Sequence, residues 1–117
     1  MTINADFIAL KQIVKQRGLL DKQPAFYVGI VIIKFSLFMA SIVALFLTDS
    51  VWFQMANAIF FGFVMGQIAF TSHSACHKQC FRESWQNELT SLTLGNLLLG
   101  ISHAWWTERH NTHHANP

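Results

Sequence analysis

Two long apolar segments constrain the fold of this chain more than any other feature of its sequence. The segment from Phe26 to Leu47 contains only Lys34 as a formal charge, and the segment from Val51 to Phe70 contains none. Each is close to the roughly 20 residues that a helix needs to cross the hydrocarbon core of a bilayer. The alternative is a soluble helical bundle. A chain of 117 residues has too little other sequence to cover two such helices in a bundle of this kind. We therefore expect an all-α membrane protein built on a transmembrane helical hairpin.

Basic residues are distributed unevenly around these segments. Four precede the first segment and three follow the second, whereas the connection from Thr48 to Ser50 contains none. The flanking basic residues are Lys11, Lys15, Arg17, Lys22, Lys78, Arg82 and Arg109. By the positive-inside rule, this pattern predicts an integral, multi-pass membrane protein with both termini in the cytoplasm. The long polar N-terminus does not fit a cleavable signal peptide, so the first span should remain as an anchor.

The residues before the first span predict an amphipathic helix on the membrane surface. Apolar side chains recur at helical spacing at Phe7, Leu10 and Val14. Asn4 is the expected N-cap, and Gly18 is well placed as the C′ residue that ends the helix. Such a helix lies in the interface with its apolar side toward the lipid.

The whole chain is interpreted as one partial domain, residues 1–117. Its parts are an amphipathic cytoplasmic segment (1–23), two spans (24–47 and 51–70) and a cytoplasmic-face segment (71–117). Within the last part, the apolar stretch 89–101 is too short to cross a bilayer. We expect it to be an interfacial or re-entrant segment.

A few residues in or beside the spans carry information beyond hydropathy. Lys34 is expected to snorkel to the interface or to face a polar interior. Gly62 and Gly66 form a G-x-x-x-G pair, which marks a place where another helix can approach closely. Cys76 and Cys80 would lie on the cytoplasmic side, where thiols stay reduced, so free thiols are expected, with metal ligation as the alternative.

Five of the six histidines fall into two spaced groups. The first group is His73 and His77; the second is His110, His113 and His114. Residues three or four apart share one side of a helix, so each group can point at one metal region. Neutral imidazole suits Fe, Zn, Cu and Ni alike, so the spacing does not choose the metal. His103, seven residues before the second group, is expected to be a surface histidine.

The two groups and their surroundings resemble a known family. "HSACH" and "WWTERHNTHHANP" resemble the first and second histidine boxes, H-x3-H and H-x2-H-H, of integral-membrane fatty-acid desaturases. The resemblance is strongest to the front-end or linoleoyl-CoA branch, whose members act on acyl-CoA or acyl-lipid. "GLLDKQPAFY" and "LGNLLLGIS" agree with that branch as well, and the similarity extends from about Asp6 onward.

Two departures from the family pattern stand out. The first box usually reads H-D-x-G-H, whereas Ser74 replaces the acid here and Cys76 replaces the glycine. If that acid orients a ligand imidazole, its loss weakens metal binding ~10–100-fold unless the Ser74 hydroxyl substitutes in part. The family also continues to a second pair of spans and a third box, so this sequence resembles only the N-terminal half of a desaturase.

The resemblance implies an enzyme that introduces a cis double bond into an acyl chain with dioxygen, as part of unsaturated fatty-acid metabolism. It implies a di-iron centre whose ligands here are His73, His77, His110, His113 and His114, with further ligands expected beyond residue 117. Electrons would come from an external ferredoxin or cytochrome. Five imidazoles are too few for two irons, so this fragment alone is expected not to desaturate.

For the residues around the second histidine group, the sequence supports only weaker expectations. Trp105 and Trp106 are expected to anchor the chain in the membrane interface. Glu108 and Asn111 are candidates for hydrogen bonds to the ligands, and solvent-facing positions are equally compatible with the sequence.

Other functions remain compatible with the sequence. Hydroxylases and ketolases use similar boxes, and a non-catalytic hairpin could hold zinc through the histidines and Cys76 or Cys80. Nucleic acid is not expected as a partner, because the net charge is only +2 and no basic run is interleaved with aromatics.

Overall fold

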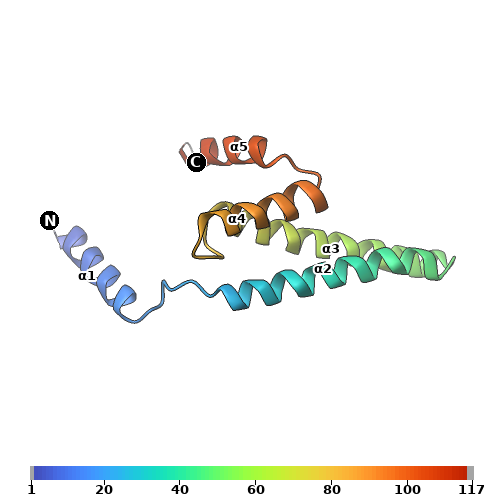
Figure 1. Ribbon diagram of the computed structural model, residues 1–117, viewed down its shortest axis with the longest axis horizontal. Helices are drawn as coiled ribbons and strands as arrows, with labels where there is room; N and C mark the ends of the chain where they lie inside the picture. Colours follow the sequence, from blue (N-terminus) through green and yellow to red (C-terminus); the bar gives the residue numbers. More distant parts are fainter. Residues whose placement is uncertain (1, 116–117) are drawn as a thin grey trace.

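The computed structural model describes residues 2–115, with side chains from Ala5 onward, and this range is helical without strands. The elements are α1 (Thr2–Gln16), α2 (Pro24–Leu47), α3 (Val51–Cys76), α4 (Ser84–Ser91), the π-helix η1 (Leu92–Leu98) and α5 (His103–Ala115). Helices α2 and α3 form a long antiparallel hairpin, α4 and η1 turn back along α3, and α5 lies beyond them (Figure 1). Helix α1 stands apart at the end of an extended connection.

The hairpin leaves most of its apolar surface uncovered by the protein. In the most apolar stretches of α2 and α3, only 6% and 17% of the residues are buried. A soluble bundle would bury these side chains, so this alternative is not supported. Both helices are long and apolar enough to cross a membrane. Helix α2 has the bounds predicted for the first span, whereas α3 continues past Phe70 to Cys76.

Polar side chains join the two long helices at buried positions. The Ser41 hydroxyl donates to Asn57 Oδ1 at 2.7 Å, and Asn57 Nδ2 donates to the Ser41 carbonyl at 3.1 Å. Near the hairpin turn, Gln54 Nε2 donates to the Thr48 carbonyl at 2.8 Å, which helps to satisfy the C-terminal end of α2. Such bonds hold helices together where lipid offers polar groups no partner.

Lys34 faces the interior of the hairpin, one of its two expected environments. Its Nζ donates to the Gln67 carbonyl and to Thr71 Oγ1, both at 2.6 Å. The glycine pair of α3, Gly62 and Gly66, does not mark a close contact between the described helices. A Cβ added at Gly62 or Gly66 would meet nothing within 4 Å, so no helix described here packs closely against them.

The side chain of Asn87 organises the turn that follows α3. Its Oδ1 accepts from the backbone N–H groups of Cys80 and Phe81 at 3.1 and 3.0 Å. Its Nδ2 donates to the carbonyls of Phe81 and Glu83, both at 2.8 Å. Asn87 is only 1% exposed, so these bonds replace the ones that water cannot make. The turn directs α4 back along α3.

Helix η1 packs closely on α3 through a glycine. A Cβ at Gly95 would lie 3.1 Å from Ser72 Oγ, closer than an ordinary contact. Leu94 is buried with Val64 and Ile68 of α3 in the same cluster. The stretch predicted to be interfacial or re-entrant is therefore helical up to Leu98, and one side of it is buried against α3.

Helix α1 ends as predicted and begins earlier than predicted. Gly18 has a φ of 66°, its N–H donates to the Lys15 carbonyl at 3.1 Å, and Leu19 N–H donates to the Val14 carbonyl at 3.2 Å. This is the pattern of a glycine C′ residue. The helix begins at Thr2, so Asn4 lies inside it and the predicted N-cap is wrong.

Replacing Asn87 should destabilise this part of the fold strongly. In Asn87→Ala, the Cys80 and Phe81 N–H groups lose their acceptor, and an unsatisfied buried group costs ~1–3 kcal/mol. We expect a loss of roughly 2–4 kcal/mol in the free energy of unfolding. Denaturant unfolding in detergent, followed by circular dichroism, measures it. Glu88→Gln, at the exposed neighbouring position, is the control, and equal stability of the two variants would contradict this role of Asn87.

Candidate metal centre

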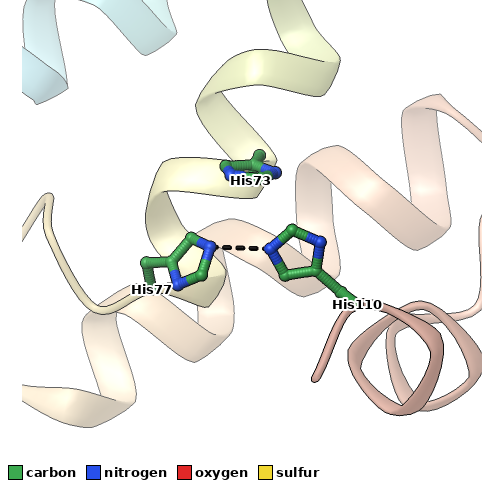
Figure 2. Close-up of side chains that lie close together, drawn as sticks. All are labelled: His73, His77 and His110. Atoms are coloured by element: carbon green, nitrogen blue, oxygen red, sulfur yellow. Dashed lines mark hydrogen bonds between the residues drawn. The ribbon is translucent and has the colours of Figure 1, made fainter. Parts of the chain in front are cut away.

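Three histidines from two distant helices meet at one point. His73 and His77 lie one turn apart at the end of α3, and His110 faces them from α5 (Figure 2). One ring nitrogen from each of the three lies within 4.8 Å of the other two. The two predicted histidine groups are therefore brought together by the fold, although 33 residues separate His77 from His110.

The ring nitrogens at the centre are close enough to compete for one proton. His77 Nε2 lies 2.7 Å from His110 Nε2, and His114 Nε2 lies 2.8 Å from the same His110 atom. In each such contact one nitrogen carries the hydrogen and the other accepts it. A metal ion needs the lone pairs of all its ligand nitrogens, so metal binding through Nε2 at this point would require each neutral imidazole to carry its hydrogen on Nδ1.

The remaining predicted ligands differ in position. His114 is exposed but hydrogen-bonded to His110, and its ring centroid lies 5.2 Å from that of His77. His113 is exposed and lies outside the three-histidine cluster; its ring centroid is 5.9 Å from that of His114. The structure thus connects His73, His77, His110 and His114 through ring contacts and leaves His113 at the edge, beside His114.

Trp106 packs directly on the histidines, a role that the sequence did not indicate. Its ring stacks on His110, with centroids 4.2 Å apart and planes 20° apart, and meets His73 edge-on at 5.2 Å. Trp106 precedes His110 by four residues, so helical spacing alone could have suggested the contact. Trp105, in contrast, is 56% exposed, as expected for an interfacial anchor.

The polar residues near the histidines behave in different ways. Ser74 Oγ donates to the Phe70 carbonyl of its own helix at 3.0 Å, so this bond does not orient a ligand imidazole. Asn111 lines an open cavity of about 610 Å³ together with His73, His77, Gln79 and His114. Glu108 is exposed to solvent. Because the cavity is open, His73, His77 and His114 are reachable from the surface.

The surroundings of His110 favour its neutral form. Desolvation lowers the pKa of His110 below its usual value of 6.5, and the neighbouring imidazoles, His114 first, lower it further. A neutral imidazole is the form that binds a metal. The lowered pKa therefore keeps this nitrogen available down to a more acidic pH than that of a solvated histidine.

Neither cysteine belongs to the three-histidine cluster. Both are free, as predicted. Cys80 is fully buried, and burial raises the pKa of its thiol to about 11. Cys76 Sγ lies 2.8 Å from Ser91 Oγ and 3.6 Å from His103 Nδ1. His103 is half-buried and contacts these residues, so the expectation of a surface histidine is wrong.

The donor set fits a metal ion of the first transition series. Three converging imidazole nitrogens suit iron, zinc, copper or nickel, and two of the three histidines, His73 and His77, line the open cavity. Their supply from two helices means that a bound ion would also join α3 to α5.

Comparison with known protein sequences identifies relatives of this chain. The family model described as fatty acid desaturase matches residues 50–117, which contain α3, both histidine groups and all the helices after the hairpin turn. The chain belongs to the fatty acid desaturase family. The resemblance seen in the two histidine motifs is thereby confirmed.

Several curated desaturases are similar over nearly the whole chain. An acyl-lipid (9-3)-desaturase of Physcomitrium patens is 30% identical over 96% of this chain, and a Delta(5) fatty acid desaturase of Caenorhabditis elegans is 33% identical over 97%. A Delta(8)-fatty-acid desaturase of Euglena gracilis is 30% identical over 94%. The chain spans between 21% and 26% of the length of these three relatives. No solved structure matches.

Removing a central imidazole should abolish tight metal binding. In His110→Ala, the nitrogen that contacts both His77 and His114 is lost. We expect the affinity for cobalt(II), measured by its visible absorption in detergent, to fall by more than the ~10–100-fold that loss of an outer hydrogen-bond partner costs. Arg109→Gln, at the exposed preceding position, should bind as the unaltered chain does. Equal affinities for both variants would show that His110 is not a ligand.

Proposed function

We propose that this desaturase-family chain provides part of an iron centre that introduces a cis double bond into a fatty acyl chain. The observation that carries the proposal is the meeting of His73 and His77 with His110, because it joins the two motifs of the family at one metal-sized point. In this proposal His113 and His114 complete the imidazole set. The iron, when bound, would supply the activation of dioxygen and the removal of two hydrogens from adjacent methylenes.

The residues of the chain hold and orient the ligands. The last turn of α3 fixes His73 and His77 on one side, since residues four apart on a helix are neighbours. Stacking against Trp106 restrains the His110 ring, so that its Nε2 keeps facing His77. The half-buried Trp106 ring also excludes water from one side of His110. A restrained imidazole loses less entropy when it binds a metal.

The membrane setting suits an acyl substrate. An acyl carbon has no polar group near the reacting bond, so its position must be fixed by an apolar channel. We place the histidines at the cytoplasmic surface, because they lie at the end of α3 that also carries Lys78 and Arg82. Both termini would then be cytoplasmic, and α1 would lie on the same surface.

The proposed centre is incomplete without further ligands. Five imidazoles cannot saturate two irons, and the relatives are about four times longer than this chain. We therefore propose that the 117 residues alone do not desaturate and that the other ligands come from segments that those relatives contain beyond the matched region. The acyl carrier, CoA or lipid, and a ferredoxin or cytochrome as electron donor complete the proposal.

Two other functions use similar ligands. A hydroxylase or ketolase would form a carbon–oxygen bond where a desaturase removes a second hydrogen. A zinc-binding hairpin would need only one tetrahedral ion. The product formed and the metal bound distinguish these functions from desaturation.

A chimera can test the proposed activity. Residues 6–117 would replace the segment that they match in the Physcomitrium patens desaturase, and the chimera would be expressed in yeast. We expect a new unsaturated acyl product by gas chromatography and mass spectrometry. The same chimera with His77→Ala should give none, because a ligand is missing. The 117-residue chain alone should also give none.

Each other outcome contradicts a defined part of the proposal. A hydroxylated product would indicate a hydroxylase. Equal product from the chimera and from its His77→Ala variant would remove His77 from the centre. Desaturation by the 117-residue chain alone would overturn its proposed dependence on further ligands.

The proposed topology can be tested separately. A reporter that is active only in the cytoplasm, fused after Pro117 or before Met1, should be active in both fusions. Inserted at Asp49 in the hairpin turn, the same reporter should be inactive, since the turn would lie across the membrane. If the reporter is active at Asp49 and inactive at both ends, the orientation in the membrane is the reverse of the proposed one.

A further inference from the structure

A second polar cluster lies beside the metal centre and is used by none of the steps above. It consists of Cys76 at the end of α3, Ser91 at the end of α4 and His103 at the start of α5. Ser91 Oγ lies 2.8 Å from Cys76 Sγ and 2.8 Å from His103 Nδ1. Ser91 is only 1% exposed, so its hydroxyl depends on these two partners. The cluster joins three helices at one buried hydroxyl.

The hydrogen bonds of the cluster are mutually consistent. Cys76 Sγ–H can donate to Ser91 Oγ while the Ser91 hydroxyl donates to His103 Nδ1. His103 is also held through its backbone, because its N–H donates to Asn96 Oδ1 at 2.8 Å. Asn96 thereby satisfies one of the N–H groups that a helix leaves free at its N-terminus. Both the ring and the backbone of His103 are therefore fixed to the body of the protein.

The position of His103 on α5 allows it to determine where His110 lies. Seven residues, two turns and about 10.5 Å of helix, separate it from His110. The two residues therefore lie on nearly the same side of α5, with Trp106 between them. A small rotation of α5 about its axis at His103 would carry His110 Nε2 away from His77. The helix has few other attachments along its length, since its remaining residues are half-buried or exposed.

The cluster itself is not arranged as a metal site. Cys76 Sγ and His103 Nδ1 are 3.6 Å apart, close to the ~3.5 Å expected for two ligands of one tetrahedral zinc ion. Ser91 Oγ, however, lies 2.8 Å from both atoms and so occupies the space between them. A hydrogen-bonded connection therefore describes the geometry better than an ion does.

We propose that His103 is a positioning residue that sets the second histidine group against the first through its bond to Ser91. The proposal rests on the metal centre proposed above. It requires no chemistry of the cluster beyond hydrogen bonding. Its loss should affect metal affinity although His103 does not touch the metal.

The test compares two substitutions at one position. His103→Ala removes the acceptor for Ser91, whereas His103→Asn keeps an amide oxygen close to the place of Nδ1. Arg109→Gln, exposed on the same helix, is the control. Each 117-residue variant is purified in detergent, its helix content is checked by circular dichroism, and it is titrated with cobalt(II). The rate of maleimide labelling of Cys76 is measured in parallel.

The labelling reports the cluster independently of any metal. Cys80 is buried and burial raises the pKa of its thiol to about 11, so at neutral pH the reaction reports Cys76. We expect His103→Ala to label faster and to bind cobalt(II) about 10- to 100-fold more weakly. His103→Asn should restore most of the affinity and of the protection.

The cobalt(II) titrations distinguish failure of the metal centre from failure of the positioning role of His103. If the unaltered chain does not bind cobalt(II), the metal centre itself is wrong and the positioning role falls with it. If the unaltered chain binds and His103→Ala binds equally well, only the positioning role is overturned. The same conclusion follows if His103→Asn is as weak as His103→Ala while both retain their helix content.

Discussion

The apolar surface of the hairpin is the constraint on which the rest of the structure depends. Helices α2 and α3 bury few of their own apolar side chains, and both are long and apolar enough to lie in the hydrocarbon of a membrane. In that environment each polar side chain needs an internal partner, and the Ser41–Asn57 and Lys34–Thr71 contacts provide such partners between the two helices. The hairpin is thereby fixed in register, and the end of α3 becomes a rigid base for His73 and His77.

The three-histidine cluster is brought together by contacts among the segments between α3 and α5. The turn held by Asn87 reverses the direction of the chain, the approach of Gly95 to Ser72 seats η1 on α3, and α5 returns across their ends. No long stretch of α5 is buried. Its orientation therefore depends on a few side chains, of which His103 and Trp106 lie on the same side as His110.

Much of this arrangement could be predicted from sequence patterns, because hydropathy and histidine spacing are local properties. The bounds of α2, the C′ role of Gly18 and the family all follow from short motifs. The predicted span ends at Phe70 because "TSHSAC" is polar, whereas α3 continues to Cys76, where it packs against α4. The contacts of Trp106 with His73 and of His103 with Ser91 depend on how α5 docks, which no local pattern records. The family resemblance implies that the two histidine groups converge, and the fold adds how closely they meet.

The π-helical geometry of η1 determines which changes in the number of its residues the fold can accommodate. A π turn holds more residues than an α turn, so it accommodates what amounts to one added residue without breaking the helix. Loss of a single residue between Leu92 and Leu98 would let the segment relax into α geometry while the residues after it keep nearly the same direction. A second added residue could not be absorbed in this way and would turn everything after it by about 100°. Ser91 and His103 would then no longer face each other, so this segment should tolerate shortening by one residue better than further lengthening.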